Sequence, residues 1–130
     1  MGHADPRVAA VDPFDLPDWL GSEEVTWRAE SGVRRTSHVR GVLTAAGDSL
    51  ECDLLAADRA YPEAVLDEQW RRAAHQSWTY GQVLLVAYDG RLTLTAPGTE
   101  FSADLVLELL ARLAKAVGVQ PDRFVVALRL

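Results

Sequence analysis

The chain has 130 residues, enough for one domain that buries a core without help from disulfides or metals. It carries 19 acidic against 13 basic side chains, which gives a net charge of −6. This balance argues against nucleic acid as a partner, because that affinity depends on clustered lysine and arginine, and it would also repel an anionic membrane surface. A protein partner fits the composition better.

Residue usage indicates the cellular setting. The sequence has no isoleucine and no asparagine, and Lys115 is its only lysine among 13 basic residues, which indicates a GC-rich bacterial genome. The one cysteine, Cys52, excludes an internal disulfide and suits a reducing compartment. No apolar run reaches the length of a signal peptide core or a membrane span, so we expect a cytoplasmic protein.

The N-terminal part contains a short acidic and apolar segment. We expect residues 1–12 to be disordered or frayed and residues 13–130 to form a single domain. Residues 12–21, DPFDLPDWLG, intersperse acidic residues with four large apolar ones. We predict a strap that packs on the domain's own core, since termini are ordered mainly when they are tied down. The alternative is a docking segment for another chain, for which Trp19 is the candidate contact.

Three segments then alternate apolar and polar residues with a period of two, which is typical of half-buried strands. They are residues 24–30, 38–45 and 49–58. Their connections are too short for crossovers, so we predict an antiparallel meander.

Cys52 falls on the inward face of the third strand, so we expect an inert buried thiol. Glu51 and Asp53 lie on the opposite face of that strand. Arg28 or Arg40 of a neighbouring strand would then complete a cross-strand charge ladder. Acid–base chemistry by this pair of carboxylates is the alternative.

The second half of the sequence mixes helical and strand patterns. Asp89-Gly90 separates two β-rich runs and predicts a type I′ hairpin. The expected elements are a helix over 60–81 with Pro62 in its first turn, a hairpin over 82–97, a helix over 103–118 capped by Ser102, and a strand over 123–130. The order β-β-β-α-β-β-α-β predicts an α+β fold. Its antiparallel or mixed sheet would have five to six strands, with the two main helices on one face.

The stretch RRAAHQSWTYGQ, which starts at Arg71, concentrates residue types common in functional sites. Successive helical residues turn by about 100°, so His75 and Ser77 point away from each other and cannot form a catalytic pair within the helix. We predict that His75 lies on the surface in a charged row with Glu68 and Arg72. The candidate binding residues are Arg71, His75, Trp78, Tyr80 and Trp19.

Other chemistry-bearing patterns are missing from the sequence. The histidines at 3, 38 and 75 lack the spacing of metal ligands, and no glycine-rich phosphate loop occurs. We therefore expect no catalytic residues, no metal site and no cofactor.

Three runs carry a family resemblance: DLPDWLG, WTYGQVLLV and DGRLTLTAPGTEF. They are similar to small proteins of high-GC Gram-positive bacteria with no known activity, so the resemblance implies no site residues. The element order also resembles that of type III secretion chaperones, which are dimers that hold client segments. Two departures are the reduction of the usual first helix to DLPDWLG and the added last strand.

Together these features predict a non-enzymatic protein-interaction module, chaperone-like or an adaptor. We expect it to form a homodimer and to bind a protein partner. The alternative is a small-molecule sensor or enzyme with a pocket between sheet and helices, near whose mouth Arg71, His75, Trp78 and Tyr80 would lie.

Overall fold

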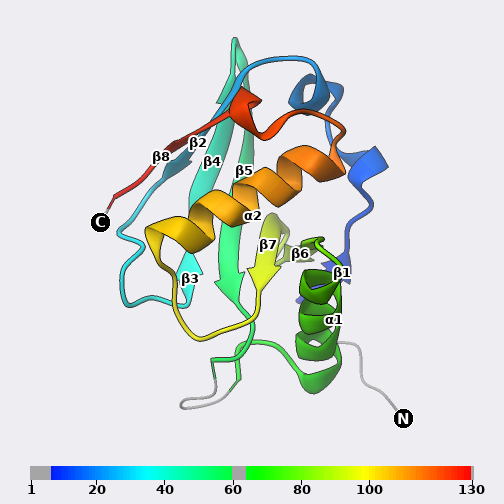
Figure 1. Cartoon of the computed structure of the whole chain (residues 1–130), viewed down its shortest axis with the longest axis vertical. Coiled ribbons are helices and arrows are strands. Elements are labelled where there is room, and N and C mark those ends of the chain that lie inside the picture. The colour runs from blue at the N-terminus through cyan, green and yellow to red at the C-terminus, as the bar shows by residue number, and fades with distance from the viewer. Residues whose placement is uncertain (1–6, 60–63, 130) are drawn as a thin grey trace.

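A twisted mixed sheet of eight strands is the centre of the computed structural model, which describes residues 7–59 and 64–129 (Figure 1). The strands are β1 (Val8–Ala10), β2 (Val25–Ala29), β3 (His38–Val39), β4 (Gly41–Ala45), β5 (Asp48–Ala56), β6 (Leu84–Tyr88), β7 (Arg91–Ala96) and β8 (Phe124–Ala127). The helices are α1 (Glu68–Thr79) and α2 (Ala103–Ala116), with short 3-10 turns η1 (Pro13–Asp15), η2 (Asp18–Gly21) and η3 (Pro121–Arg123). The order across the sheet is β1-β6-β7-β5-β4-β2-β8, and β3 also pairs with β5.

The sheet combines parallel and antiparallel pairs. β5 runs parallel to β7 and β2 parallel to β8, whereas the other pairs are antiparallel. The predicted α+β class is confirmed, and so is the antiparallel meander of β2, β4 and β5.

The predicted number of five to six strands is wrong. Residues 8–10, expected to be frayed, form β1 along the edge of β6, and β3 is separate from β4. A three-residue strand is stable only when another edge supplies its hydrogen bonds, and this partner lies far away in the sequence. Residues 1–6 lie outside the described part of the chain.

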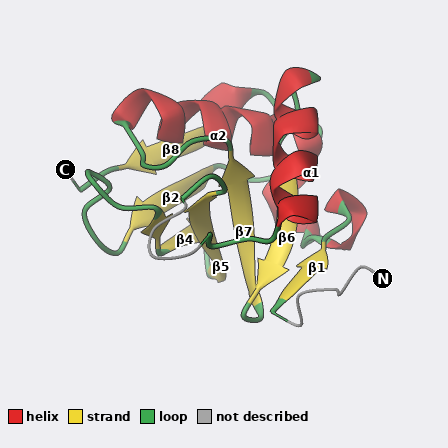
Figure 2. Ribbon diagram, turned by 90° about the horizontal axis from the view of Figure 1, so that it is seen from below, coloured by secondary structure: helices red, strands yellow, loops and turns green. Residues whose placement is uncertain are grey.

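The main core lies between α2 and one face of the sheet. Helix α2 crosses this face in both views (Figures 1 and 2). Ser102 caps the helix by accepting a hydrogen bond from the backbone N–H of Leu105, as the sequence predicts. The buried side chains of this core include Val106, Leu109, Leu110 and Leu113 from α2, with Leu54, Leu85 and Leu94 from the sheet.

Helix α1 packs against the opposite face of the sheet, so the prediction of both helices on one face is wrong. Side chains alternate along a strand, and Leu55 and Val86, which cluster with Leu66 and Ala74, point away from the α2 side. The physical reason is that both faces of β5 and β6 are apolar. Leu54 and Leu85 lie in the core under α2, and Leu55 and Val86 lie on the other face, so each face needs a helix to cover it.

The local predictions around the helices have mixed outcomes. The hairpin is confirmed, because Asp89 and Gly90 have φ values of 50° and 79°, as a type I′ turn requires. Helix α1 begins at Glu68, much later than residue 60, because the Asp67 side chain caps it through the N–H of Trp70. Pro62, predicted in its first turn, lies outside the described residues.

The acidic and apolar segment is a strap, as predicted. Leu20 is fully buried, and Leu16 and Trp19 pack against the main core. Phe14 is the exception, since its side chain is 94% exposed. Among the described residues, no helix has the length and apolar character needed to cross a membrane.

Candidate functional site

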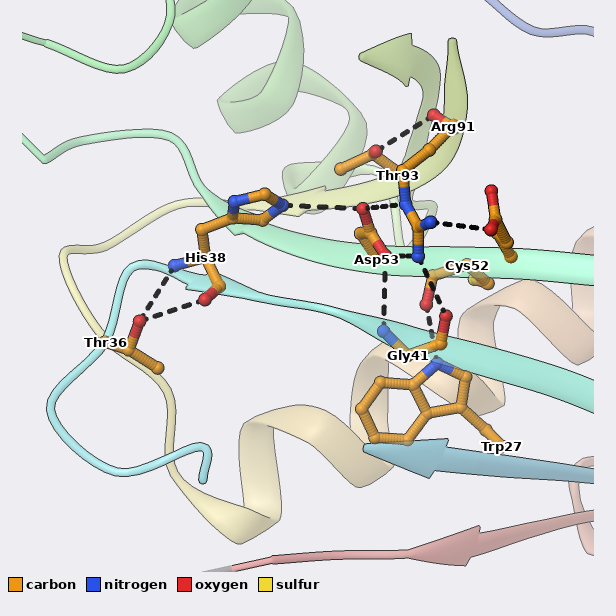
Figure 3. Close-up of polar contacts among 9 residues, drawn as sticks. Trp27, Thr36, His38, Gly41, Cys52, Asp53, Arg91 and Thr93 are labelled. Atoms are coloured by element: carbon orange, nitrogen blue, oxygen red, sulfur yellow. Dashed lines mark hydrogen bonds and ion pairs between the residues drawn. The ribbon is translucent and has the colours of Figure 1, made fainter. Parts of the chain in front are cut away.

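A buried charge cluster connects β3, β4, β5 and β7 (Figure 3). Asp53 is 1% exposed and accepts two hydrogen bonds from Arg91, at 2.7 Å from Nε and 2.8 Å from Nη2. It also accepts a 3.2 Å hydrogen bond from the backbone N–H of Gly41, and His38 Nε2 lies 3.5 Å from it. The Asp53 carboxylate thus accepts the hydrogen bond from the Gly41 N–H in place of a backbone carbonyl, at the point where β3 has ended and β4 begins.

The ionised state of Asp53 is strongly favoured. Burial acts to raise its pKa, but the neighbouring His38 and the hydrogen bonds from Arg91 and the Gly41 N–H outweigh it and lower the pKa to about 2. The hydrogen bond to Asp53 in turn raises the pKa of Arg91. A carboxylate held ionised and surrounded by donors is suited to join strands, not to exchange protons near neutral pH.

The arginine that forms ion pairs with Glu51 and Asp53 is neither of the two that the sequence predicts. Arg91 contacts Asp53 and also Glu51, at 2.8 Å, whereas Arg28 or Arg40 was expected. A cross-strand charge ladder at Glu51 and Asp53 is present, but its cation comes from β7, the parallel neighbour of β5. Sequence alternation predicts the face of a residue, but it does not predict which strand lies alongside.

Burial also accounts for the cysteine. Cys52 is fully buried, and desolvation raises the pKa of its thiol well above the usual range. Its carbonyl accepts a 2.8 Å hydrogen bond from the indole N–H of Trp27. The prediction of an inert thiol fits this environment.

His75 has a carboxylate partner that the sequence does not indicate. Its Nε2 lies 2.8 Å from Asp58, which also accepts a 2.7 Å hydrogen bond from the N–H of Gly98. The contact ties α1 to the ends of β5 and β7. The predicted surface position is confirmed, since the His75 side chain is 55% exposed, and Glu68 and Arg72 form their ion pair at 2.7 Å.

A cleft of about 470 Å³ lies where the end of α2 meets the start of β6. Its volume falls within the range of about 300–1,000 Å³ typical of ligand sites. Three distant segments of the chain form its walls: residues 10–13, 80–85 and 112–116. The lining residues are Ala10, Val11, Pro13, Tyr80, Gly81, Gln82, Val83, Leu84, Leu85, Arg112, Lys115 and Ala116.

Two cations of α2 line this cleft and differ in their contacts. Arg112 stacks 3.5 Å from the centre of the Trp78 ring and donates hydrogen bonds to the carbonyl oxygens of Trp78 and Gln82. It therefore fixes the segment between α1 and β6. Lys115 is exposed, and no ion pair joins it to any residue in the described part of the chain.

A second groove of about 260 Å³ continues from the cleft along the strap. Pro13 and Ala116 line both hollows, so they form one elongated surface. The exposed aromatic side chains of this surface are Tyr80, which is 72% exposed, and Phe14. Tyr80 lines the cleft and Phe14 lines the groove, so both rings are accessible from this surface.

The structure brings only part of the predicted site together. Tyr80 lines the cleft, and Trp78 lies under Arg112 next to it. Arg71 and His75 do not line the cleft, and Trp19 packs against the core. The residues that the sequence interpretation missed are Phe14, Pro13, Arg112, Lys115 and Ala116.

No group of three or more potential metal ligands occurs among the described residues. Comparison with family models, with curated proteins and with solved structures finds no match. The likeness to secretion chaperones in element order therefore stays a prediction.

Proposed function

We propose that this protein is a non-enzymatic interaction module that binds an apolar, acidic segment of a protein chain in the cleft. The observation that supports it most is the elongated surface itself. The accessible apolar groups of Val11, Pro13 and Ala116 line it together with the exposed side chains of Tyr80 and Lys115. Such a surface suits an aromatic or aliphatic anchor flanked by carboxylates.

The polar clusters favour a binding role over catalysis. Asp53 is enclosed by its own donors, and His75 is engaged with Asp58 on a helix face outside the cleft. The groups that do line the cleft are mostly apolar, and Arg112 already donates hydrogen bonds to the backbone carbonyls of Trp78 and Gln82. This arrangement suits the binding of a ligand, since neither Asp53 nor His75 lines the cleft.

A small-molecule ligand is the second candidate, favoured by the cleft volume of about 470 Å³. An extended segment fits better because the cleft and the neighbouring groove share Pro13 and Ala116 and continue into each other. A compact metabolite would use only one of them.

Selection from a displayed peptide library tests the proposal. Ala116 is exposed on α2 and lines both hollows, so Ala116→Trp should fill the surface and leave the core intact. Leu107→Trp, at a half-exposed position of the same helix outside the cleft, is the matched control. We expect acidic peptides with a large apolar residue to bind the wild type and the control and to lose binding to Ala116→Trp.

Two results would count against this function. One is the recovery of no peptide that distinguishes the wild type from Ala116→Trp. The other is a metabolite that raises the melting temperature of the wild type but not of Ala116→Trp, which would favour the small-molecule candidate.

A further inference from the structure

The most exposed large hydrophobic side chain of the described residues belongs to a rigid turn. Phe14 is 94% exposed, yet the backbone on both sides of it is fixed. Asp12 accepts a 2.9 Å hydrogen bond from the N–H of Phe14, and the N–H groups of Asp15 and Leu16 donate to the carbonyls of residues 12 and 13. Prolines at 13 and 17 restrict the turn further. An aromatic side chain presented on a preorganised turn loses little entropy on binding.

The turn carries the charges that the cleft lacks. Asp12, Asp15 and Asp18 surround Phe14 and are exposed. The cleft offers Lys115, which forms no ion pair within the described chain, beside apolar walls. The segment DPFDLPD is thus an apolar anchor flanked by carboxylates, which is the chemistry that the cleft is proposed to bind.

The anchor and the cleft are neighbours on one surface. Pro13 lines the cleft, and Phe14, the next residue, lines the adjoining groove. A two-fold axis beside Pro13 would bring the Phe14 of each copy over the cleft of the other. Such an interface uses the same patch on both subunits and closes as a dimer, so it leaves no free anchor.

We infer that the cleft binds the Phe14 turn of a second copy of this chain, so that two copies exchange these turns in a symmetric dimer. The inference rests on the proposed function, since it names the occupant of the same cleft. In the dimer, Phe14 packs against Val11, Pro13 and Ala116 of the partner copy, none of which is buried in the monomer, and Asp15 lies next to the partner copy's Lys115. Tyr80 covers the inserted ring.

Sedimentation equilibrium over a range of protein concentrations tests the inference. The wild type should dimerise, and Phe14→Ala should raise the dimer Kd by about thirtyfold or more, as the loss of a central aromatic anchor does. Lys115→Glu should also weaken the dimer, and the double variant Asp15→Lys with Lys115→Glu should restore it. Leu107→Ala, which removes an exposed apolar side chain elsewhere on α2, should leave the Kd unchanged.

A peptide of residues 11–18, VDPFDLPD, tests the occupant separately. It should bind the Phe14→Ala protein, whose cleft is free, and should fail to bind the Ala116→Trp variant of that protein. A monomeric wild type at every concentration, or a Phe14→Ala variant that dimerises as the wild type does, would overturn the inference. The proposed function would still stand if library peptides bind the cleft, and both would fail if no peptide binds it.

Discussion

Replacement of Asp53 by asparagine is the sharpest test of how the sheet is held together. The change keeps the shape of the side chain and removes its charge, which leaves Arg91 with Glu51 as its remaining carboxylate partner. Arg91 is only 16% exposed, so water compensates for little of the loss. Removal of one member of a buried ion pair costs about 3–5 kcal/mol. Because Glu51 remains, we expect the lower end, about 3 kcal/mol.

The pKa of Asp53 gives an independent magnitude and the sign of the pH dependence. Folding lowers this pKa from 3.8 to about 2. At about 1.4 kcal/mol for each pKa unit, the shift corresponds to about 2 kcal/mol of stability. The folded pKa is the lower one, so this stabilisation is complete above the unfolded pKa and is lost as the pH falls from about 4 towards 2.

Urea denaturation of the wild type and Asp53→Asn between pH 7 and pH 2 measures both effects. The difference in unfolding free energy should be constant from pH 7 to 5 and should shrink below pH 4. Glu51→Gln is the matched control, because Glu51 contacts the same arginine but is 64% exposed, and it should cost less than about 1 kcal/mol. Equal stability of wild type and Asp53→Asn at pH 7, or a difference that does not change with pH, would refute the reasoning.

Three further predictions concern other parts of the fold. Gly41→Ala should lower stability by about 1–3 kcal/mol in thermal unfolding, because its Cβ would lie 2.4 Å from the Trp27 ring. Gly32→Ala is its control, since the nearest atom is 3.9 Å away, and equal losses at both positions would contradict the packing argument. Cys52 should not react with a thiol reagent in native buffer and should react once denatured, because it is fully buried; rapid native labelling would exclude this environment. Asp67→Ala should cost about 1 kcal/mol in chemical denaturation through loss of the α1 cap, and an unchanged midpoint would show that the cap is dispensable.

The partners of buried charges show where the sequence stops being informative. Alternation correctly placed Glu51 and Asp53 on one face of β5 and Cys52 on the other. Their cation, Arg91, is 38 residues from Asp53 and lies on a strand that runs parallel to β5. Since nothing local encodes which strands become neighbours, Arg28 and Arg40 were equally reasonable candidates.

The candidate site also combines a residue that the sequence predicts with residues that it does not. Tyr80 is one of the residues predicted near the mouth of a pocket, and it does line the cleft. Lys115 and Pro13 belong to segments that look ordinary alone and face each other only after folding. The sequence did not predict the exposure of Phe14 either, because a strap of large apolar residues predicts burial for all of them.

By itself the sequence determined the features that arise within a few residues: the strand periods, the Asp89-Gly90 turn and the Ser102 cap. These depend on backbone sterics and on hydrogen bonds between near neighbours, which local residue types decide. Tertiary structure alone decided the strand order, the opposite faces of the two helices, the Arg91 pair and the cleft built from residues 10–13, 80–85 and 112–116. Each of these brings together distant segments through the burial of apolar surface, which is non-directional and leaves no local signature of its partner.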